Sequence, residues 1–187
     1  VFGRQGTFVW LPEFLQQLTA LGVSETISFD EYAQAVGERG AHFAAHYGGQ
    51  LVAAGRSPYR LSAYLATKSL EECFNESCAH ELLHCGFGHY DLYGNIIPCS
   101  CSGISLGNAA DLGEFTRTFS LDDHPVLHAL VTHGVKGLYA MAVAEYGYNP
   151  LERYAGKCHL CGDIRKHLVA SGAQLSELAP RDYYAQV

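Results

Sequence analysis

The sequence has few positive charges and few charges of any kind. Only 17% of its 187 residues are charged, and 12 Lys and Arg stand against 19 Asp and Glu, which gives a formal charge of −7. Proteins that bind the phosphate backbone of nucleic acids need clustered Lys and Arg. The basic residues here are scattered, with one small cluster at Arg165, Lys166 and His167. We therefore expect no nucleic-acid partner.

Long apolar runs and an initiator Met are also missing. No uninterrupted apolar run approaches the roughly 18 residues that suggest a membrane span. The first residues, VFGRQGTFVW, lack the charged and then apolar layout of a secretion signal. We therefore expect a cytoplasmic protein with no membrane partner. Because the chain begins with Val inside a segment with a strand pattern, we also expect a fragment of a longer protein.

Cysteine is the residue type that points to chemistry. Seven cysteines would leave one over in a disulfide framework, and clustered cysteines in a reducing cytosol are more often ligands or redox groups. Cys158 and Cys161 form a C-x-x-C pair in YAGKCHLCGDIRKHLV, and Cys78 and Cys101 bracket CAHELLHCGFGHYDLYGNIIPCSC. Two residues between cysteines let both sulfurs reach one centre, and a hairpin between the other two would bring them to it. The pattern predicts an iron–sulfur or zinc site.

The C-x-x-C pair allows two further interpretations. CHLC begins a predicted helix, where the dipole and the free N–H groups stabilise anionic sulfur. Such a pair is also the dithiol of thioredoxin-like proteins, but there it follows a strand, and YNPLERYAGK is not strand-like. A structural zinc module that uses the same four cysteines stays open as an alternative.

A second motif competes with the cysteines. His80, Glu81 and His84 spell HELLH, which matches the HExxH motif of zinc peptidases, where both His bind zinc and the Glu activates water. Two glycines follow within four residues, although the helix would have to continue. The extended motif needs a third His at position 90, which is Tyr90, and His89 comes one place early. A zinc metallopeptidase is therefore a rival hypothesis.

The first part of the chain alternates two kinds of pattern. Short β-branched and aromatic runs at 6–10, 26–29 and 50–54 are typical of strands, and helical patterns follow the first two. The order β-α-β-α-β favours parallel strands and an α/β layer. Arg56, in the turn after the third run, would then be placed for an anionic ligand, unless it belongs to a surface loop.

From about residue 70 the pattern changes. GHYDLYGNIIP predicts two short strands around a turn, with His89 and Asp91 on one strand face, where they could line a pocket. HPVLHALVTHG and VKGLYAMAVAEYG predict two helices, and a last helix runs from Cys158 to about residue 170. Asp122 and Asp123 are expected to cap the helix that begins at His124.

The strings around the cysteines resemble the C-terminal region of radical S-adenosylmethionine proteins. The similarity rests on Cys78, Gly94, Asn95 and Cys101 in HYDLYGNIIPCSCSGISLGNA, on the following helices and on KCHLCGDIRKHLV. It implies an α/β fold in which residues 1–69 are the last βα units of a partial (β/α)6 barrel. Residues 70–187 would then be a small α+β cluster-binding extension, akin to SPASM and twitch extensions, with a β-hairpin and helices.

The resemblance also implies cofactors. In that family a CxxxCxxC loop holds a first 4Fe-4S cluster, which cleaves S-adenosylmethionine. This sequence lacks the loop, since its cysteines before residue 86 are separated by four and six residues. We therefore expect the C-terminal fragment of such an enzyme, whose full length binds S-adenosylmethionine and a second cluster and acts on an unknown small molecule or peptide. The chain itself would hold an auxiliary 4Fe-4S cluster through Cys78, Cys101, Cys158 and Cys161, with Cys85 and Cys99 as alternates.

Overall fold

The structure is a computed structural model that describes residues 16, 19–22, 29–45, 54–84, 88–99 and 101–187. The chain divides into two compact units, Val1–Ala44 and Ala45–Val187. The first unit contains α2 (Phe29–Phe43), which Gly37 interrupts with φ 76° and ψ 168°. Asp30 and Glu31 stand in its first turn, where negative charge suits the helix dipole.

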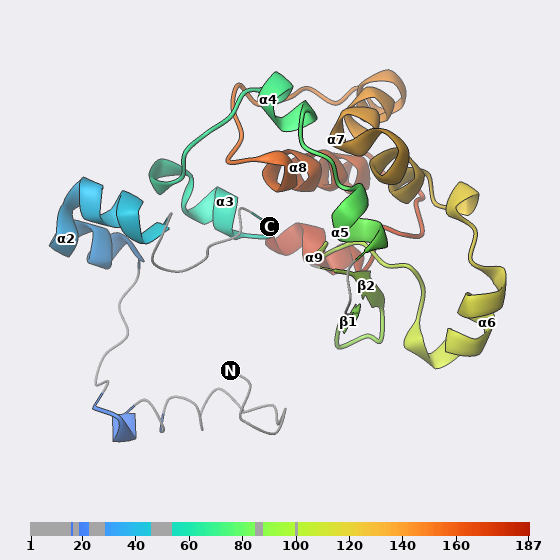
Figure 1. Cartoon of the computed structure of the whole chain (residues 1–187), viewed down its shortest axis with the longest axis horizontal. Coiled ribbons are helices and arrows are strands. Elements are labelled where there is room, and N and C mark those ends of the chain that lie inside the picture. Colours follow the sequence, from blue (N-terminus) through green and yellow to red (C-terminus); the bar gives the residue numbers. More distant parts are fainter. Residues whose placement is uncertain (1–15, 17–18, 23–28, 46–53, 85–87, 100) are drawn as a thin grey trace. The chain divides into compact units, whose positions relative to one another are not determined.

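The second unit is built mainly from short helices (Figure 1). Its only sheet among the described residues is the antiparallel pair β1–β2, in which Gly88 lies opposite Pro98 and Tyr90 opposite Ile96. The elements in chain order are α3 (Ser57–Arg60), η2 (Ser62–Tyr64), α4 (Leu70–Phe74), α5 (Ala79–Leu83), β1 (Gly88–Tyr90), β2 (Ile96–Pro98), η3 (Ala109–Asp111), α6 (Leu112–Thr118), η4 (Leu121–Asp123), α7 (Pro125–Tyr146), α8 (Lys157–Ala170) and α9 (Arg181–Gln186).

The prediction of a partial (β/α)6 barrel was wrong. The described residues are mostly helical, and they contain no barrel of βα units. The expected strands at 6–10, 26–29 and 50–54 lie almost entirely outside the described residues; Phe29 begins α2, and Ala54 is in no strand. Short apolar runs cannot be told from buried helix segments by periodicity alone, so the pattern did not establish strands. The hairpin and the helix that begins near Cys158 were predicted correctly, but this helix is not the last, because α9 follows it.

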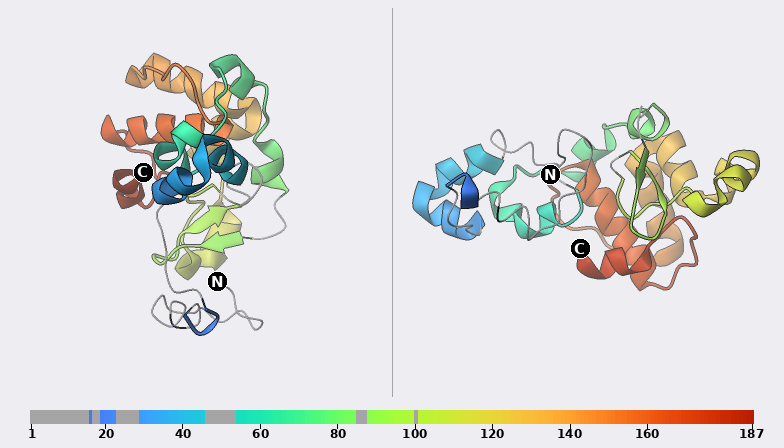
Figure 2. Two further views of the ribbon diagram at one scale, coloured as in Figure 1. Left: turned by 90° about the vertical axis from the view of Figure 1, so that its left-hand side faces the viewer. Right: turned by 90° about the horizontal axis from the view of Figure 1, so that it is seen from below.

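The core of the second unit lies around α7 and α8. α8 lies between α7 and α9, and α4 and α5 pack on α7 (Figures 1 and 2). Gly134, with φ 65° and ψ −161°, interrupts α7, so the two predicted helices are confirmed as its two halves. By length and composition α7 would suit a membrane span. Six of its side chains are nevertheless buried in the core: Val126, Leu127, Leu130, Val135, Leu138 and Ala142.

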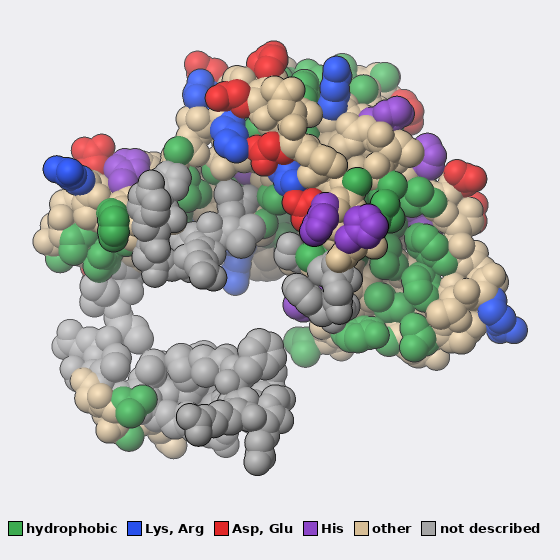
Figure 3. Space-filling model, viewed as in Figure 1, with side chains coloured by type: hydrophobic (Ala, Val, Ile, Leu, Met, Phe, Trp, Pro, Cys, Tyr) green, Lys and Arg blue, Asp and Glu red, His purple; other side chains and the backbone are tan. Residues whose placement is uncertain are grey.

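The surface carries mixed charge. On the face shown in Figure 3, Lys and Arg side chains are interspersed with Asp and Glu and do not gather into one patch. Opposite charges at such spacing keep the local potential low, which is consistent with the scattered basic residues of the sequence.

A buried carboxylate, and not the predicted aspartates, caps α7. Asp122 and Asp123 belong to η4, so that prediction was wrong. The backbone N–H of Val126 instead donates to Glu177 Oε1 at 2.8 Å, and the Glu177 side chain is 1% exposed. The backbone carbonyl of Glu177 also accepts from the N–H of Ser105 at 2.8 Å. One residue therefore joins the start of α7 to the loop after the hairpin.

We expect Glu177→Ala to lower the free energy of unfolding by about 1–3 kcal/mol, because the buried N–H of Val126 loses its acceptor. Glu177→Gln keeps an oxygen at that position and should lose less. Urea unfolding followed by circular dichroism measures both variants. Equal losses in the two variants would show that the cap is not the cause.

Candidate metal centre

The four predicted cysteines line one cavity in the second unit. The cavity also borders Leu130 of α7 and five side chains with polar groups: Glu81, Ser102, Lys157, Arg165 and Tyr183. The cysteines come from three separate segments: the residue before α5, the loop after β2 and the first turns of α8. In that order they are Cys78, Cys101, Cys158 and Cys161. The structure thus brings together residues up to 83 positions apart in the sequence.

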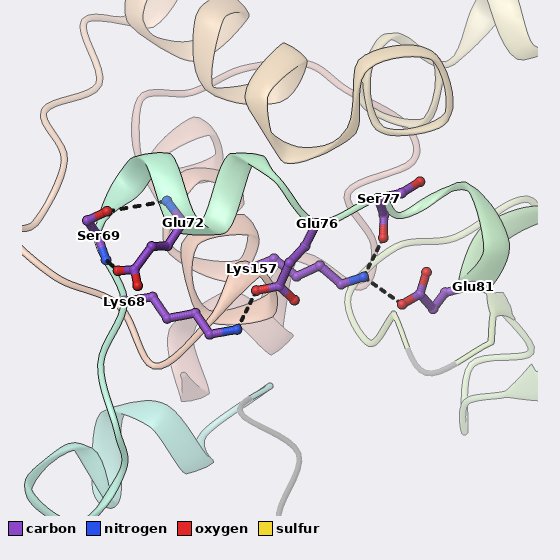
Figure 4. Close-up of polar contacts among 7 residues, drawn as sticks. All are labelled: Lys68, Ser69, Glu72, Glu76, Ser77, Glu81 and Lys157. Carbon is purple, nitrogen blue, oxygen red and sulfur yellow. Dashed lines mark hydrogen bonds and ion pairs between the residues drawn. The ribbon is translucent and has the colours of Figure 1, made fainter.

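Backbone pairing brings the segment before α4 to the segment before α8. The N–H of Lys68 donates to the carbonyl of Tyr154 at 2.6 Å, and the N–H of Tyr154 donates back at 2.9 Å. Arg153 reinforces the pair, since its Nε donates to Thr67 Oγ1 at 2.7 Å. A capping box, in which Ser69 and Glu72 bond to each other's backbone N–H groups, begins α4 immediately afterwards (Figure 4).

Lys157 continues this connection up to the cavity. Its ammonium donates to Glu81 Oε1 at 2.6 Å and to the carbonyl of Ser77, the residue before the first cysteine (Figure 4). Burial acts to lower the pKa of Lys157, but the bond to Glu81 and the nearby Cys78 raise it on balance. The lysine therefore stays charged, and it fixes the start of α5 against the start of α8.

Arg165 makes the corresponding connection on the other side of the cavity. Its Nε donates to the carbonyl of Cys161 at 3.3 Å, and its Nη1 donates to the carbonyl of Ser102 and to Tyr184 Oη, both at 2.9 Å. The side chain is buried, with 5% exposed. These bonds hold the loop that carries Cys101 next to α8.

Three of the four thiols have raised pKa values and are therefore neutral near pH 7. Burial, followed by the neighbouring Cys161, raises the pKa of Cys78 to about 12 and that of Cys101 to about 12. The same two causes raise the pKa of Cys158. Each of the three thiols is affected by Cys161, which shows that the four side chains lie close enough to interact. Since metals bind thiolates, loading would release protons.

The cavity has more room than one water molecule needs. Within the described residues, no three His, Cys, Asp or Glu side chains lie close enough together to hold a single metal ion. The cavity has a volume of about 50 Å³, whereas one water needs about 10–15 Å³. A four-iron cluster takes one thiolate on each iron, so its four sulfur ligands stand apart around it.

The remaining cysteines lie away from the cavity or outside the described residues. Cys73 is fully buried in the hydrophobic core, and burial raises the pKa of its thiol. Cys99, the alternate for Cys101, is half-buried with φ 48° and does not line the cavity. Cys85, the alternate for Cys78, is outside the described residues.

The HELLH segment does not have the geometry of a peptidase site. α5 ends at Leu83, so His84 has already left the helix, with φ −120° and ψ 14°. The rings of His80 and His84 are 5.8 Å apart at their centroids, and no described side chain completes a metal site with them. Although burial acts to raise it, the Lys157 ammonium lowers the pKa of Glu81, so this carboxylate is held as an ion-pair partner.

Sequence reasoning missed three residues of the site: Lys157, Arg165 and Tyr183. Arg165 follows Cys158 by seven positions and Cys161 by four, so it shares their side of α8, while Lys157 directly precedes Cys158. That spacing is a usable signal. Tyr183 lies in α9, 22 positions after Cys161, and nothing in the local sequence connects it to the cysteines.

No protein family, no curated protein and no solved structure matches the chain. The case for a function therefore depends on the geometry and the charge of this cavity.

The thiol pKa values predict how the metal-free protein responds to pH. A thiol whose pKa is about 12 in the folded chain, against an ordinary 9.0, stabilises the fold below pH 9. That contribution is lost as the pH rises from 9 toward 12. Under reducing conditions, the wild type should lose more stability than Cys78→Ala/Cys101→Ala between about pH 7.5 and about pH 10.5 in urea unfolding. Equal losses would assign the effect to other groups.

Proposed function

We propose that this chain binds a 4Fe-4S cluster through Cys78, Cys101, Cys158 and Cys161. The observation that carries the proposal is the buried guanidinium of Arg165 beside these thiols. Among the described residues no carboxylate forms an ion pair with it. Its partners are two carbonyls and one hydroxyl, none of which carries a negative charge.

A buried cation without an anion is costly in a folded chain. Removing a charge from water costs several kcal/mol unless an opposite charge compensates it. Burial opposes the charge of Arg165, while Cys161 and Tyr184, as potential anions, raise its pKa. A cluster held by four thiolates carries net negative charge at the place where these thiols lie. The cluster would therefore supply the missing partner of the arginine.

The start of α8 favours the same occupant. Cys158 lies in its first turn, and no side chain caps this end of the helix, since Gly156 occupies the cap position. The first N–H groups of a helix have no partner within it and carry partial positive charge. Thiolate ligands at this end are stabilised by both effects.

The proposed role is that of the auxiliary cluster of a radical S-adenosylmethionine enzyme. Support comes from the resemblance of residues 70–187, while the CxxxCxxC loop would have to be supplied by residues outside this sequence. When bound, a 4Fe-4S cluster accepts and releases single electrons. Because four cysteines would occupy all four irons, none stays open to a substrate. Electron transfer is therefore favoured over substrate anchoring.

The direct test is anaerobic purification with iron and sulfide. We expect a brown protein with broad visible absorption, which Cys158→Ala/Cys161→Ala abolishes. Cys99→Ala is the matched control, since Cys99 is two positions from Cys101 but outside the cavity, and this variant should keep the colour. A colourless wild type that holds one tight zinc would rule the proposal out.

The arginine gives an independent test. In Arg165→Met, the gain in unfolding free energy on cluster loading should fall by about 2 kcal/mol, because the desolvated charge pair is lost. Arg165→Lys keeps the charge and should lose less. Thermal unfolding of loaded and metal-free protein measures the gain. If loading stabilises Arg165→Met as much as the wild type, the arginine does not compensate the cluster.

A further inference from the structure

A second, open groove lies on the other side of Tyr183. Its volume is about 530 Å³, within the range of roughly 300–1,000 Å³ that is typical of small-molecule sites. Its walls include Tyr183, Tyr93 and Pro180, and Arg56 and Asp182 also border it. Tyr183 is the one residue that lines both this groove and the cysteine cavity.

The ring of Tyr183 is held firmly. A side chain on Gly103 would lie 2.4 Å from this ring, and φ 81° at Gly103 also favours glycine. Tyr184 supports the ring edge-on, with centroids 5.1 Å apart and planes at 86°. Tyr184 is itself buried and bonded to Arg165 and to the carbonyl of Gly103. The groove therefore has one preformed aromatic wall.

The DLYGN turn supplies Tyr93. Asp91 Oδ1 accepts from the N–H groups of Tyr93 at 2.8 Å and Asn95 at 2.9 Å, so Asp91 braces the turn. Asn108 Nδ2 donates to the carbonyl of Tyr93 at 2.9 Å, and Gly94, with φ 79°, lets Asn108 approach. The motif that carried the resemblance thus positions a second aromatic residue at the groove.

The groove also presents two opposite charges that do not pair. Neither the guanidinium of Arg56 nor the carboxylate of Asp182 makes an ion pair or side-chain hydrogen bond with a described residue. In a chain of net charge −7, most acidic ligands would be repelled. A ligand that carries both a carboxylate and an ammonium group satisfies Arg56 and Asp182 together.

We propose that this groove binds a free amino acid with an aromatic side chain. Its carboxylate pairs with Arg56, its ammonium pairs with Asp182, and its ring packs on Tyr183 and Tyr93. The sequence left two roles open for Arg56, a ligand of an anion and a residue of a surface loop. The groove and the cysteine cavity are separate spaces, so this proposal stands whether or not the chain holds a cluster.

Three probe compounds distinguish the role of Arg56 from that of Asp182. They are L-phenylalanine, 3-phenylpropionate, which lacks the ammonium group, and phenethylamine, which lacks the carboxylate. Saturation-transfer NMR gives the affinity of each for the whole chain. Arg56→Gln should weaken phenylalanine and phenylpropionate by at least about tenfold and leave phenethylamine unchanged. Asp182→Asn should weaken phenylalanine and phenethylamine and leave phenylpropionate unchanged. Arg60→Gln is the matched control, because Arg60 is an exposed arginine of α3 that does not line the groove.

Several outcomes would overturn the proposal. If phenylalanine does not bind, or if it binds all variants equally, Arg56 and Asp182 have no role in binding it. If N-acetylphenylalaninamide, which has neither charge, binds as well as phenylalanine, the groove takes peptide segments.

Colour after iron and sulfide treatment should be the same in Arg56→Gln, Asp182→Asn and the wild type. Failure of the cluster and failure of the groove are thus distinguishable.

Discussion

The interaction on which the rest of the second unit depends is the set of bonds around Arg165. This one guanidinium reaches α8 through Cys161, the loop after the hairpin through Ser102, and α9 through Tyr184. Every acceptor is uncharged, so the arginine organises three segments while its own charge stays uncompensated. Lys157 acts similarly on the opposite side, but there Glu81 balances the charge. The asymmetry between the two cations is the basis of our proposal that an anionic cluster occupies the cavity.

The segments that the sequence predicted best are those in which neighbouring residues decide the structure. Gly94 and the Asp91 side chain fold the turn between β1 and β2 locally, and the pattern from Cys158 onward forms α8. The prediction of a barrel failed because short apolar runs carry no information about what they pack against. The prediction of the α7 cap failed for a related reason, since the capping residue, Glu177, lies 51 positions from Val126 in the sequence.

In the candidate site, too, the local sequence predicted some features, and long-range contacts determine the others. Spacing singled out the four cysteines that line the cavity, and the resemblance implied the same four, with Cys85 and Cys99 as alternates. HELLH matched a motif equally well, yet α5 ends at Leu83 and Glu81 pairs with Lys157. The two His of an HExxH motif face one metal only when both lie on one continuous helix. The partners of Arg165 could not be predicted, since burial and long-range contacts create them.

The wide spacing of the cysteines has a consequence for folding. Cys101 and Cys158 are 57 positions apart, and contacts between distant segments form late because closing long loops costs chain entropy. A chain in which α8 has not yet docked presents only a close pair and two isolated thiols, which hold a cofactor poorly. Insertion of the proposed cluster would then follow docking of α8 and stabilise only the completed unit by mass action. The cofactor would thereby distinguish chains that have finished folding from those that have not.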